Sequence, residues 1–253
     1  MDKKILTEVC CGSLDDALLA EEAGADRIEL NSCLQQGGLT PSLGTLLEVK
    51  KRLKIPVMAM VRPREAGFDY TDGEIAVMER DASLFAENGV DGIVFGSLNA
   101  DGTINRRQSE RMMKLIGDRQ SVFHRAFDVV PDPFGALDQL IGLGVTRVLT
   151  SGQQASVYDG VPLIRELIRY AGEKIEILPG AGIYSGNVRE ILEKTGANQI
   201  HFASVTVRRD TSTSCNPRIF FGGAYYPPED RHGIADLDSM KKIIEKAGEA
   251  EYE

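Results

Sequence analysis

A recurring pattern organises this chain, and it first appears as Gly24-Ala25-Asp26-Arg27-Ile28-Glu29-Leu30. A glycine is followed by a short polar step and then by a run of β-branched and other aliphatic residues. The pattern returns at 89–95, 144–150 and 196–202, so that its glycines are 52 to 65 residues apart. Glycine in this place ends a helix in the left-handed conformation, and the apolar run predicts a strand that is buried on both faces. Each interval has room for two strand–helix units, and four copies therefore predict eight strands.

Four further apolar runs fill the intervals between these copies, and helical patterns separate all the runs. The helical patterns carry Ser, Asp or Asn near their starts, as residues 13–23 do. Eight such units, with no GxGxxG sequence after the first strand, favour a closed (β/α)8 TIM barrel over an open doubly wound sheet. We expect the intervening strands at Leu6–Cys11, Pro56–Arg62, Ser121–Asp128 and Lys174–Pro179.

The predicted barrel forms one domain over residues 1–253, because no linker interrupts the alternation. A long irregular segment at about 205–236 follows the eighth strand and contains the pairs Phe220-Phe221 and Tyr225-Tyr226. A segment of that length is usually functional or disordered. A variable insertion, a subunit contact and a lid are the interpretations that fit it.

Charge and composition limit the partners of the chain. Of its 253 residues 42% are apolar, and its net charge of −9 makes binding to nucleic acid or to anionic membrane surfaces unfavourable. The sequence holds no run of 18 apolar residues and no apolar leader ahead of Glu8, so we expect a cytoplasmic protein that spans no membrane. Its four cysteines lack the paired spacing of a structural zinc site and are expected to be reduced thiols.

Polar residues gather at the carboxyl ends of the predicted strands, where barrel enzymes place their chemistry. Alternation along the strands turns these residues toward the barrel axis, and burying them is costly unless they pair with one another or bind a ligand. Two interpretations follow: an interior held by Glu–Arg ion pairs, or an active site. The residues are Glu8, Cys10, Glu29, Asn31, Arg62, His124, Asp128 and His201.

As an active site, this group would act on a small anionic or phosphorylated metabolite by acid/base chemistry, such as isomerisation, carbon–carbon cleavage or hydrolysis. The absence of lysine from the strand ends disfavours a Schiff-base mechanism. Loops 7 and 8 of a barrel often hold a phosphate, and the anion-binding candidates are Gly180, Gly182 and Ser204, with Arg64 as a cationic partner. The catalytic candidates are Glu8, Glu29, Arg62, His124, Asp128 and His201.

Seven motifs, taken in order along the chain, resemble those of the CutC family, and the resemblance as a whole runs from about Glu8 to Ser204. The resemblance implies a cytoplasmic (β/α)8 barrel that assembles as a homo-oligomer, a dimer or a tetramer, and takes part in copper homeostasis by binding Cu(I). The motifs are Glu8-Val9-Cys10, Gly24-Ala25-Asp26-Arg27-Ile28-Glu29-Leu30, Gly37-Gly38-Leu39-Thr40-Pro41-Ser42, Arg62-Pro63-Arg64, Phe123-His124-Arg125-Ala126-Phe127-Asp128, Leu149-Thr150-Ser151-Gly152 and Pro179-Gly180-Ala181-Gly182-Ile183.

The resemblance also implies two cysteine ligands for Cu(I), one in the first motif and one directly after the Ile-Glu-Leu of the second. Cys10 stands at the first position, whereas Asn31 stands at the second and offers a hard ligand that Cu(I) does not favour. Cys33, Met58 and Met60 supply other sulfur atoms, and core packing is the alternative role of the two methionines. A copper-binding protein and a barrel enzyme of unknown reaction therefore stand as two hypotheses.

Overall fold

The fold is a nearly closed barrel of eight parallel strands, and the computed structural model describes it over residues 4–221 and 229–250. Each strand from β1 to β6 pairs with the next strand along the chain, and β8 pairs with β1. A parallel bridge between Gly180 and His201 brings the end of β7 against β8. The strands are β1 (Leu6–Cys11), β2 (Arg27–Leu30), β3 (Val57–Met60), β4 (Gly92–Phe95), β5 (Gln120–Phe123), β6 (Arg147–Thr150), β7 (Glu176–Pro179) and β8 (Gln199–Phe202).

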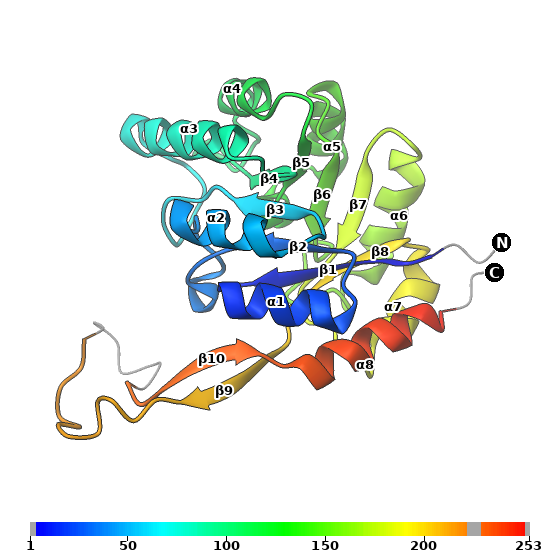
Figure 1. The fold of residues 1–253 in the computed structure, drawn as a ribbon. Helices are drawn as coiled ribbons and strands as arrows, with labels where there is room; N and C mark the ends of the chain where they lie inside the picture. The colour runs from blue at the N-terminus through cyan, green and yellow to red at the C-terminus, as the bar shows by residue number, and fades with distance from the viewer. Residues whose placement is uncertain (1–3, 222–228, 251–253) are drawn as a thin grey trace.

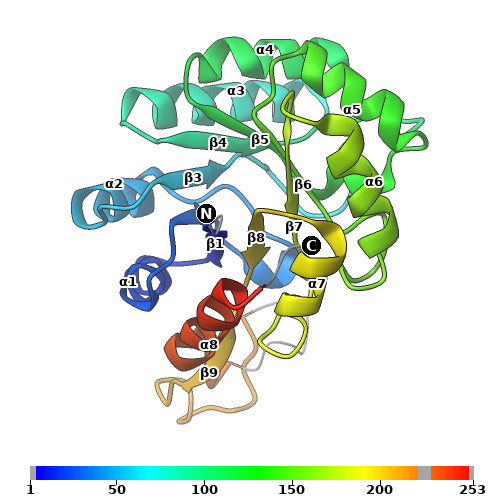
Figure 2. The same cartoon turned by 90° about the vertical axis from the view of Figure 1, so that its right-hand side faces the viewer.

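Helices alternate with these strands and surround the barrel, as Figure 2 shows. The predicted (β/α)8 architecture is therefore confirmed. Two short 3-10 helices, η1 (Leu34–Gln36) and η2 (Arg125–Val129), follow β2 and β5. The α-helices are α1 (Leu14–Ala23), α2 (Leu43–Arg52), α3 (Asp72–Glu87), α4 (Arg106–Ile116), α5 (Pro133–Gly142), α6 (Val161–Ala171), α7 (Val188–Thr195) and α8 (Leu237–Gly248).

The four copies of the recurring pattern have the structure that their glycines predict. Gly24, Gly89, Gly144 and Gly196 have φ angles of 90°, 76°, 74° and 73°, all in the left-handed region. A side chain at these positions would be strained, whereas glycine adopts the conformation freely. The copies lead into β2, β4, β6 and β8, so the pattern marks every second strand of the barrel.

Alternation along the strands separates two apolar regions. Residues that face outward, such as Val9, Ile28 and Leu30, belong to a large core that includes buried residues of the surrounding helices. Residues that face the barrel axis on β3 to β7 form a smaller cluster of Met58, Met60, Val94, Val122, Leu149 and Leu178. The inward positions of β1, β2 and β8 carry polar side chains instead, so toward the strand ends the barrel interior is apolar on one side and polar on the other. At the strand starts of β5 to β7 the interior is polar as well, with Gln120, Arg147 and Glu176.

An antiparallel hairpin made of β9 (Val205–Arg209) and β10 (Arg231–Ala235) follows β8 and extends away from the barrel (Figure 1). We call this hairpin the arm. Its base is held by the buried Asp16, whose carboxylate accepts a 2.7 Å hydrogen bond from the Ala235 amide. The segment expected to be irregular over 205–236 thus begins and ends with paired strands, while Tyr225-Tyr226 lies outside the described residues. The single-domain organisation over 1–253 stays a prediction.

Candidate functional site

The structure brings together the inward-facing polar residues of three neighbouring strands. Cys10 on β1 is the register partner of Glu29 on β2, and Glu8 on β1 is the register partner of His201 on β8. Because inward positions recur every second residue, these side chains share the interior of one side of the barrel. Asn31 follows β2 and lies against the same group.

Glu8 is fully buried, and both of its carboxylate oxygens have partners. Oε2 accepts a 2.5 Å hydrogen bond from Arg27 Nε, and Oε1 lies 2.8 Å from His201 Nδ1. Burial alone would raise the pKa of Glu8, but the positive charge of Arg27 and the hydrogen bond with His201 hold that pKa far below its usual range. An ionised carboxylate therefore fixes the orientation of the His201 ring and directs Nε2 away from Glu8.

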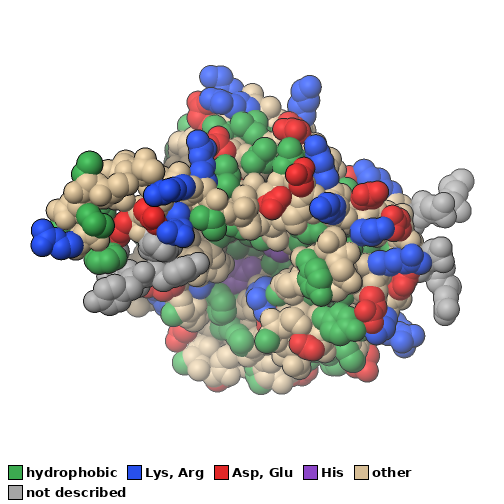
Figure 3. Space-filling view, turned by 90° about the horizontal axis from the view of Figure 1, so that it is seen from below, with side chains coloured by type: hydrophobic (Ala, Val, Ile, Leu, Met, Phe, Trp, Pro, Cys, Tyr) green, Lys and Arg blue, Asp and Glu red, His purple; other side chains and the backbone are tan. Residues whose placement is uncertain are grey.

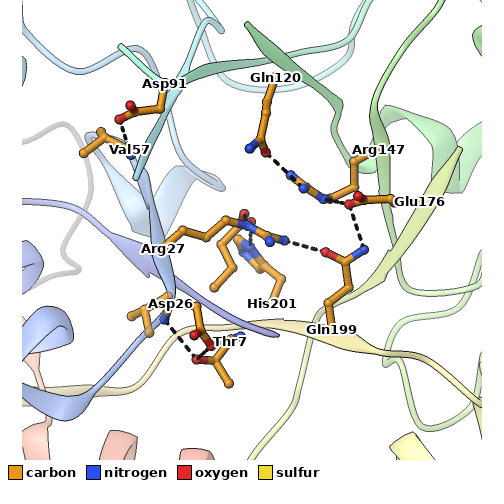
Figure 4. Close-up of polar contacts among 12 residues, drawn as sticks. Thr7, Asp26, Arg27, Val57, Asp91, Gln120, Arg147, Glu176, Gln199 and His201 are labelled. Carbon is orange, nitrogen blue, oxygen red and sulfur yellow. Dashed lines mark hydrogen bonds and ion pairs between the residues drawn. The ribbon is translucent and has the colours of Figure 1, made fainter. Parts of the chain in front are cut away.

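A chain of hydrogen bonds continues from Arg27 across the amino-terminal end of the barrel (Figure 4). Arg27 Nη2 donates to Gln199 Oε1 at 2.6 Å, and Gln199 Nε2 donates to Glu176 Oε2 at 3.1 Å. Arg147 then pairs with Glu176 at 2.7 Å and donates to Gln120 at 3.0 Å. Glu8 joins this layer through Arg27, so for Glu8 the structure agrees with the first interpretation, an interior held by paired charges.

Three side chains above this layer form a group that can hold a metal ion. The Cys10 Sγ, a Glu29 carboxylate oxygen and a His201 ring nitrogen all lie within 4.8 Å of one another. Thiolate, carboxylate and imidazole are the ligands that proteins offer to zinc and to copper. Sequence reasoning placed all three residues on the barrel axis but assigned only Cys10 to a metal.

Two buried oxygen atoms, one in this group and one beside it, lack a partner among the described residues. They are Glu29 Oε2 and Asn31 Oδ1. The Asn31 amide nitrogen is used, since it donates to Glu29 Oε1 at 2.9 Å and lies 3.4 Å from Cys10 Sγ. Buried polar atoms are normally hydrogen-bonded, so two unpartnered oxygens beside a thiol and an imidazole are what a binding site for a cation would leave.

Burial and neighbouring charges set the protonation of the group. Burial raises the pKa of Cys10 to about 11 and also raises the pKa of Glu29. For His201, burial lowers the pKa, but the carboxylates of Glu29 and Glu8 and the contact with Cys10 raise it well above its usual value. The thiol and the imidazole therefore carry protons that a bound metal ion would displace.

Asp128 does not lie on a strand, and the prediction that placed it there is wrong. β5 ends at Phe123, and Asp128 belongs to η2. Its carboxylate accepts hydrogen bonds from the Thr150 hydroxyl at 2.5 Å and from the Ser151 amide at 3.0 Å, and it pairs with Arg125 at 2.7 Å. Through these hydrogen bonds, Asp128 attaches the loop that follows β6 to the 3-10 helix η2.

Arg62 and His124 follow β3 and β5, and both contact Phe68. The Arg62 guanidinium is 5.4 Å from the centre of the Phe68 ring, and the His124 and Phe68 ring centres are 4.9 Å apart. Strand alternation could not reveal Phe68 or its neighbour Tyr70, because both belong to the loop between β3 and α3.

The predicted anion-binding residues have other contacts in the structure. Arg64 pairs with Glu74 at 2.5 Å and donates to backbone carbonyls of its own loop. Gly180 lies where β7 meets β8, and a Cβ there would be 2.7 Å from Leu149 Cδ1. Gly182 has a φ of 81°, which accounts for a glycine in that turn. The backbone oxygen of Ser204 accepts from the Asp236 amide at 2.9 Å. Anion binding by these residues stays a prediction.

The remaining sulfur atoms lie apart from the group. Cys33 is exposed and precedes η1, and Cys215 is exposed in the arm. Met58 and Met60 are buried in the apolar cluster of the barrel interior, which is the packing role that was the alternative for them. Cys11 faces outward from β1 and is buried in the large core.

Known proteins share both the sequence and the barrel fold of this chain. Among the described residues, no helix combines the length and apolar character needed to cross a membrane. The model of the CutC family matches residues 5–206. A family protein CutC of Treponema denticola is 56% identical over 242 residues, which cover 96% of this chain and 98% of that protein.

Two further relatives carry the same family name. The copper homeostasis protein cutC homolog of Homo sapiens is 41% identical over 238 residues, which cover 94% of this chain and 87% of that protein. The crystal structure of a CutC protein from Streptococcus agalactiae superposes with a TM-score of 0.75 at 35% identity, over 78% of this chain and 98% of that chain. The chain therefore belongs to the CutC family.

Proposed function

We propose that this protein takes part in copper homeostasis by binding one Cu(I) ion at Cys10, His201 and Glu29. The observation that carries the proposal is the approach of their three ligand atoms to within 4.8 Å of one another. The human relative bears the name of a copper homeostasis protein, and that name supports the choice of copper.

The three ligand atoms differ in how well they suit Cu(I). Thiolate is a soft ligand that suits Cu(I), and imidazole also binds copper well, whereas a carboxylate is a hard ligand. Cys10 and His201 would therefore hold the ion. Glu29 would complete the site and balance its charge, using the Oε2 atom that has no other partner.

A competition titration tests this proposal. Cu(I) is titrated anaerobically, under reducing conditions, against a chromophoric chelator. The starting protein carries Cys33→Ser and Cys215→Ser, because both thiols are exposed and would bind Cu(I) outside the site. We expect one tight site per chain. Cys10→Ser and His201→Gln should each weaken it by more than about a hundredfold, which is beyond the effect of removing a residue that only supports a ligand.

Cys11→Ala is the matched control, since Cys11 is next to Cys10 in the sequence but faces the opposite side of β1. It should leave the affinity for Cu(I) unchanged. Binding that survives Cys10→Ser, or a failure of the starting protein to bind Cu(I), would contradict the proposal.

We also propose that the protein acts in the cytoplasm as a homo-oligomer and that the arm supplies the contact between copies. Every residue of β9 is exposed, and the apolar side chains of Val205 and Val207 are 55% and 64% exposed. Such side chains on a projecting hairpin are typical of a surface that another chain covers.

A further inference from the structure

A second group of buried polar atoms at the barrel mouth has no assigned role. Arg62 and His124 are only 6% and 4% exposed, yet Arg62 Nε and His124 Nε2 have no hydrogen-bond partner among the described residues. The hydroxyl of Tyr70 is also buried and lies against Arg62, which can only donate to it, so the hydroxyl proton has no acceptor among the described residues. On the face seen in Figure 3, histidine side chains are visible inside a hollow of the surface beside the arm.

The hydrogen-bonding state of His124 follows from its contacts. Its Nδ1 accepts a 3.1 Å hydrogen bond from the Ala126 amide, so the proton of the neutral ring is on Nε2. Burial, together with the positive charge of Arg62, lowers the pKa of His124 to about 3. Nε2 is therefore the donor of a neutral imidazole.

Arg62 is a buried cation whose partners are neutral. Nη1 donates to the carbonyls of Gln36 and Gly38 at 2.9 and 3.0 Å, and Nη2 donates to the carbonyl of Ala66 at 2.9 Å. No carboxylate pairs with it in the described part of the chain. A buried charge without an opposite charge is costly. Loop carbonyls nevertheless fix the position of this guanidinium, and its Nε has no hydrogen-bond partner among the described residues.

The two groups at the mouth are separate but adjacent. The turn that holds Arg62 also touches the candidate metal group, because a Cβ on Gly38 would lie 2.5 Å from Asn31 Oδ1. The metal group consists of electron-pair donors, whereas Arg62, His124 and Tyr70 present hydrogen-bond donors. The two groups therefore suit ligands of opposite polarity.

We propose that Arg62 Nε, His124 Nε2 and the Tyr70 hydroxyl bind an oxyanion of a small molecule at the mouth of the barrel. The cation supplies the charge that an anion needs, and the two neutral donors add hydrogen bonds without adding charge. The charged oxygens of a carboxylate and of a phosphate both accept hydrogen bonds, so both classes of ligand fit these donors. The site does not depend on copper, since none of its three residues belongs to the candidate metal group.

The test uses metal-free protein labelled with ¹⁵N at histidine and prepared with a chelator. Long-range ¹H–¹⁵N spectra report the His124 ring nitrogens, which His124→Gln identifies by the loss of its signals. The protein is titrated with inorganic phosphate in one series and with acetate in a second series. Sodium chloride at matched ionic strength is the reference.

We expect a saturable shift of His124 Nε2 with at least one of the two oxyanions. Arg62→Gln should weaken that binding by about tenfold to a hundredfold, the loss expected for one charged hydrogen bond. Arg111→Gln is the control for net charge, because Arg111 is exposed and pairs with Glu79 on α3. It should leave the binding unchanged.

Each outcome decides the proposal. Saturation by phosphate alone assigns the site to phosphorylated ligands, and saturation by acetate alone assigns it to carboxylates. Tyr70→Phe removes one donor only, and it should weaken binding several-fold even if Arg62→Gln does not fold. No saturable shift with either anion, or binding that neither Arg62→Gln nor Tyr70→Phe changes, would overturn the proposal.

Discussion

Cys10 and Asn31 show at the residue scale how this chain differs from the two-cysteine site that its family resemblance implies. The Asn31 amide lies 3.4 Å from Cys10 Sγ, so position 31 is close enough to act on a metal bound to Cys10. A thiolate there would replace a hard amide with a soft ligand.

Asn31→Cys should therefore raise the affinity for Cu(I), by about tenfold or more for a gain of one favourable ligand at about 1.4 kcal/mol per tenfold. The measurement is the anaerobic chelator competition described above, in the protein that lacks Cys33 and Cys215. Asn31→Ser, which adds no thiol, is the control. An affinity that Asn31→Cys leaves unchanged or lowers would contradict the location of the site.

At the element scale, Asp26 joins the two strands that carry Cys10 and Glu29. Its carboxylate accepts hydrogen bonds from the Thr7 amide at 2.9 Å and the Thr7 hydroxyl at 3.0 Å, and it also pairs with Lys4. Burial raises the pKa of Asp26, but these partners lower it more, and the net shift is downward.

The sign of the pH effect follows from this shift. Because the pKa of Asp26 is lower in the folded chain than in the unfolded one, its contribution to stability is present above pH 4 or so and is lost as the pH falls through the folded pKa. Asp26→Asn should lower the free energy of unfolding by about 1 kcal/mol at pH 7. The difference from wild type should shrink toward pH 3 in urea titrations. A difference that grows on acidification would contradict the assignment.

The predictions from sequence succeeded where strand alternation decides the outcome. Glu8, Cys10, Glu29 and His201 face the interior because each occupies an inward position of a strand whose neighbours are in register. Alternation has no meaning beyond a strand end, and Asp128 was misplaced for this reason, since the chain turns into η2 after Phe123.

Other residues could not be predicted from the sequence, for different physical reasons. Phe68 and Tyr70 lie in a loop, where no period links sequence to direction. Arg147, Glu176 and Gln199 lie at inward positions but at the starts of their strands, away from the end at which barrels place their chemistry. The pairing of Glu8 with both Arg27 and His201 depends on contacts between distant segments, which a sequence does not report.

At the scale of the whole molecule, the arm is the feature that the barrel does not explain. The match to the family model ends at residue 206, one residue after the arm begins at Val205. If it joins copies of the chain, light scattering coupled to size-exclusion chromatography should give the mass of a dimer or a tetramer for the wild-type protein.

Val207→Glu places a charge on the arm and should shift the protein toward the monomer, because burying an unpaired carboxylate in an interface is costly. Val77→Glu is the control, since Val77 is 50% exposed on α3 of the barrel. A monomeric wild-type protein, or an oligomer that Val207→Glu leaves intact, would contradict this role of the arm.

The three side chains that β1, β2 and β8 bring together are expected to bind the copper ion themselves. X-ray absorption at the copper edge shows which atoms do so, on protein that lacks Cys33 and Cys215 and is loaded with one equivalent of Cu(I). We expect one sulfur and at least one imidazole nitrogen around the ion, with the sulfur signal lost in Cys10→Ser and the imidazole signal lost in His201→Gln. Copper surrounded by two sulfurs, or by no sulfur or imidazole at all, would contradict the claim.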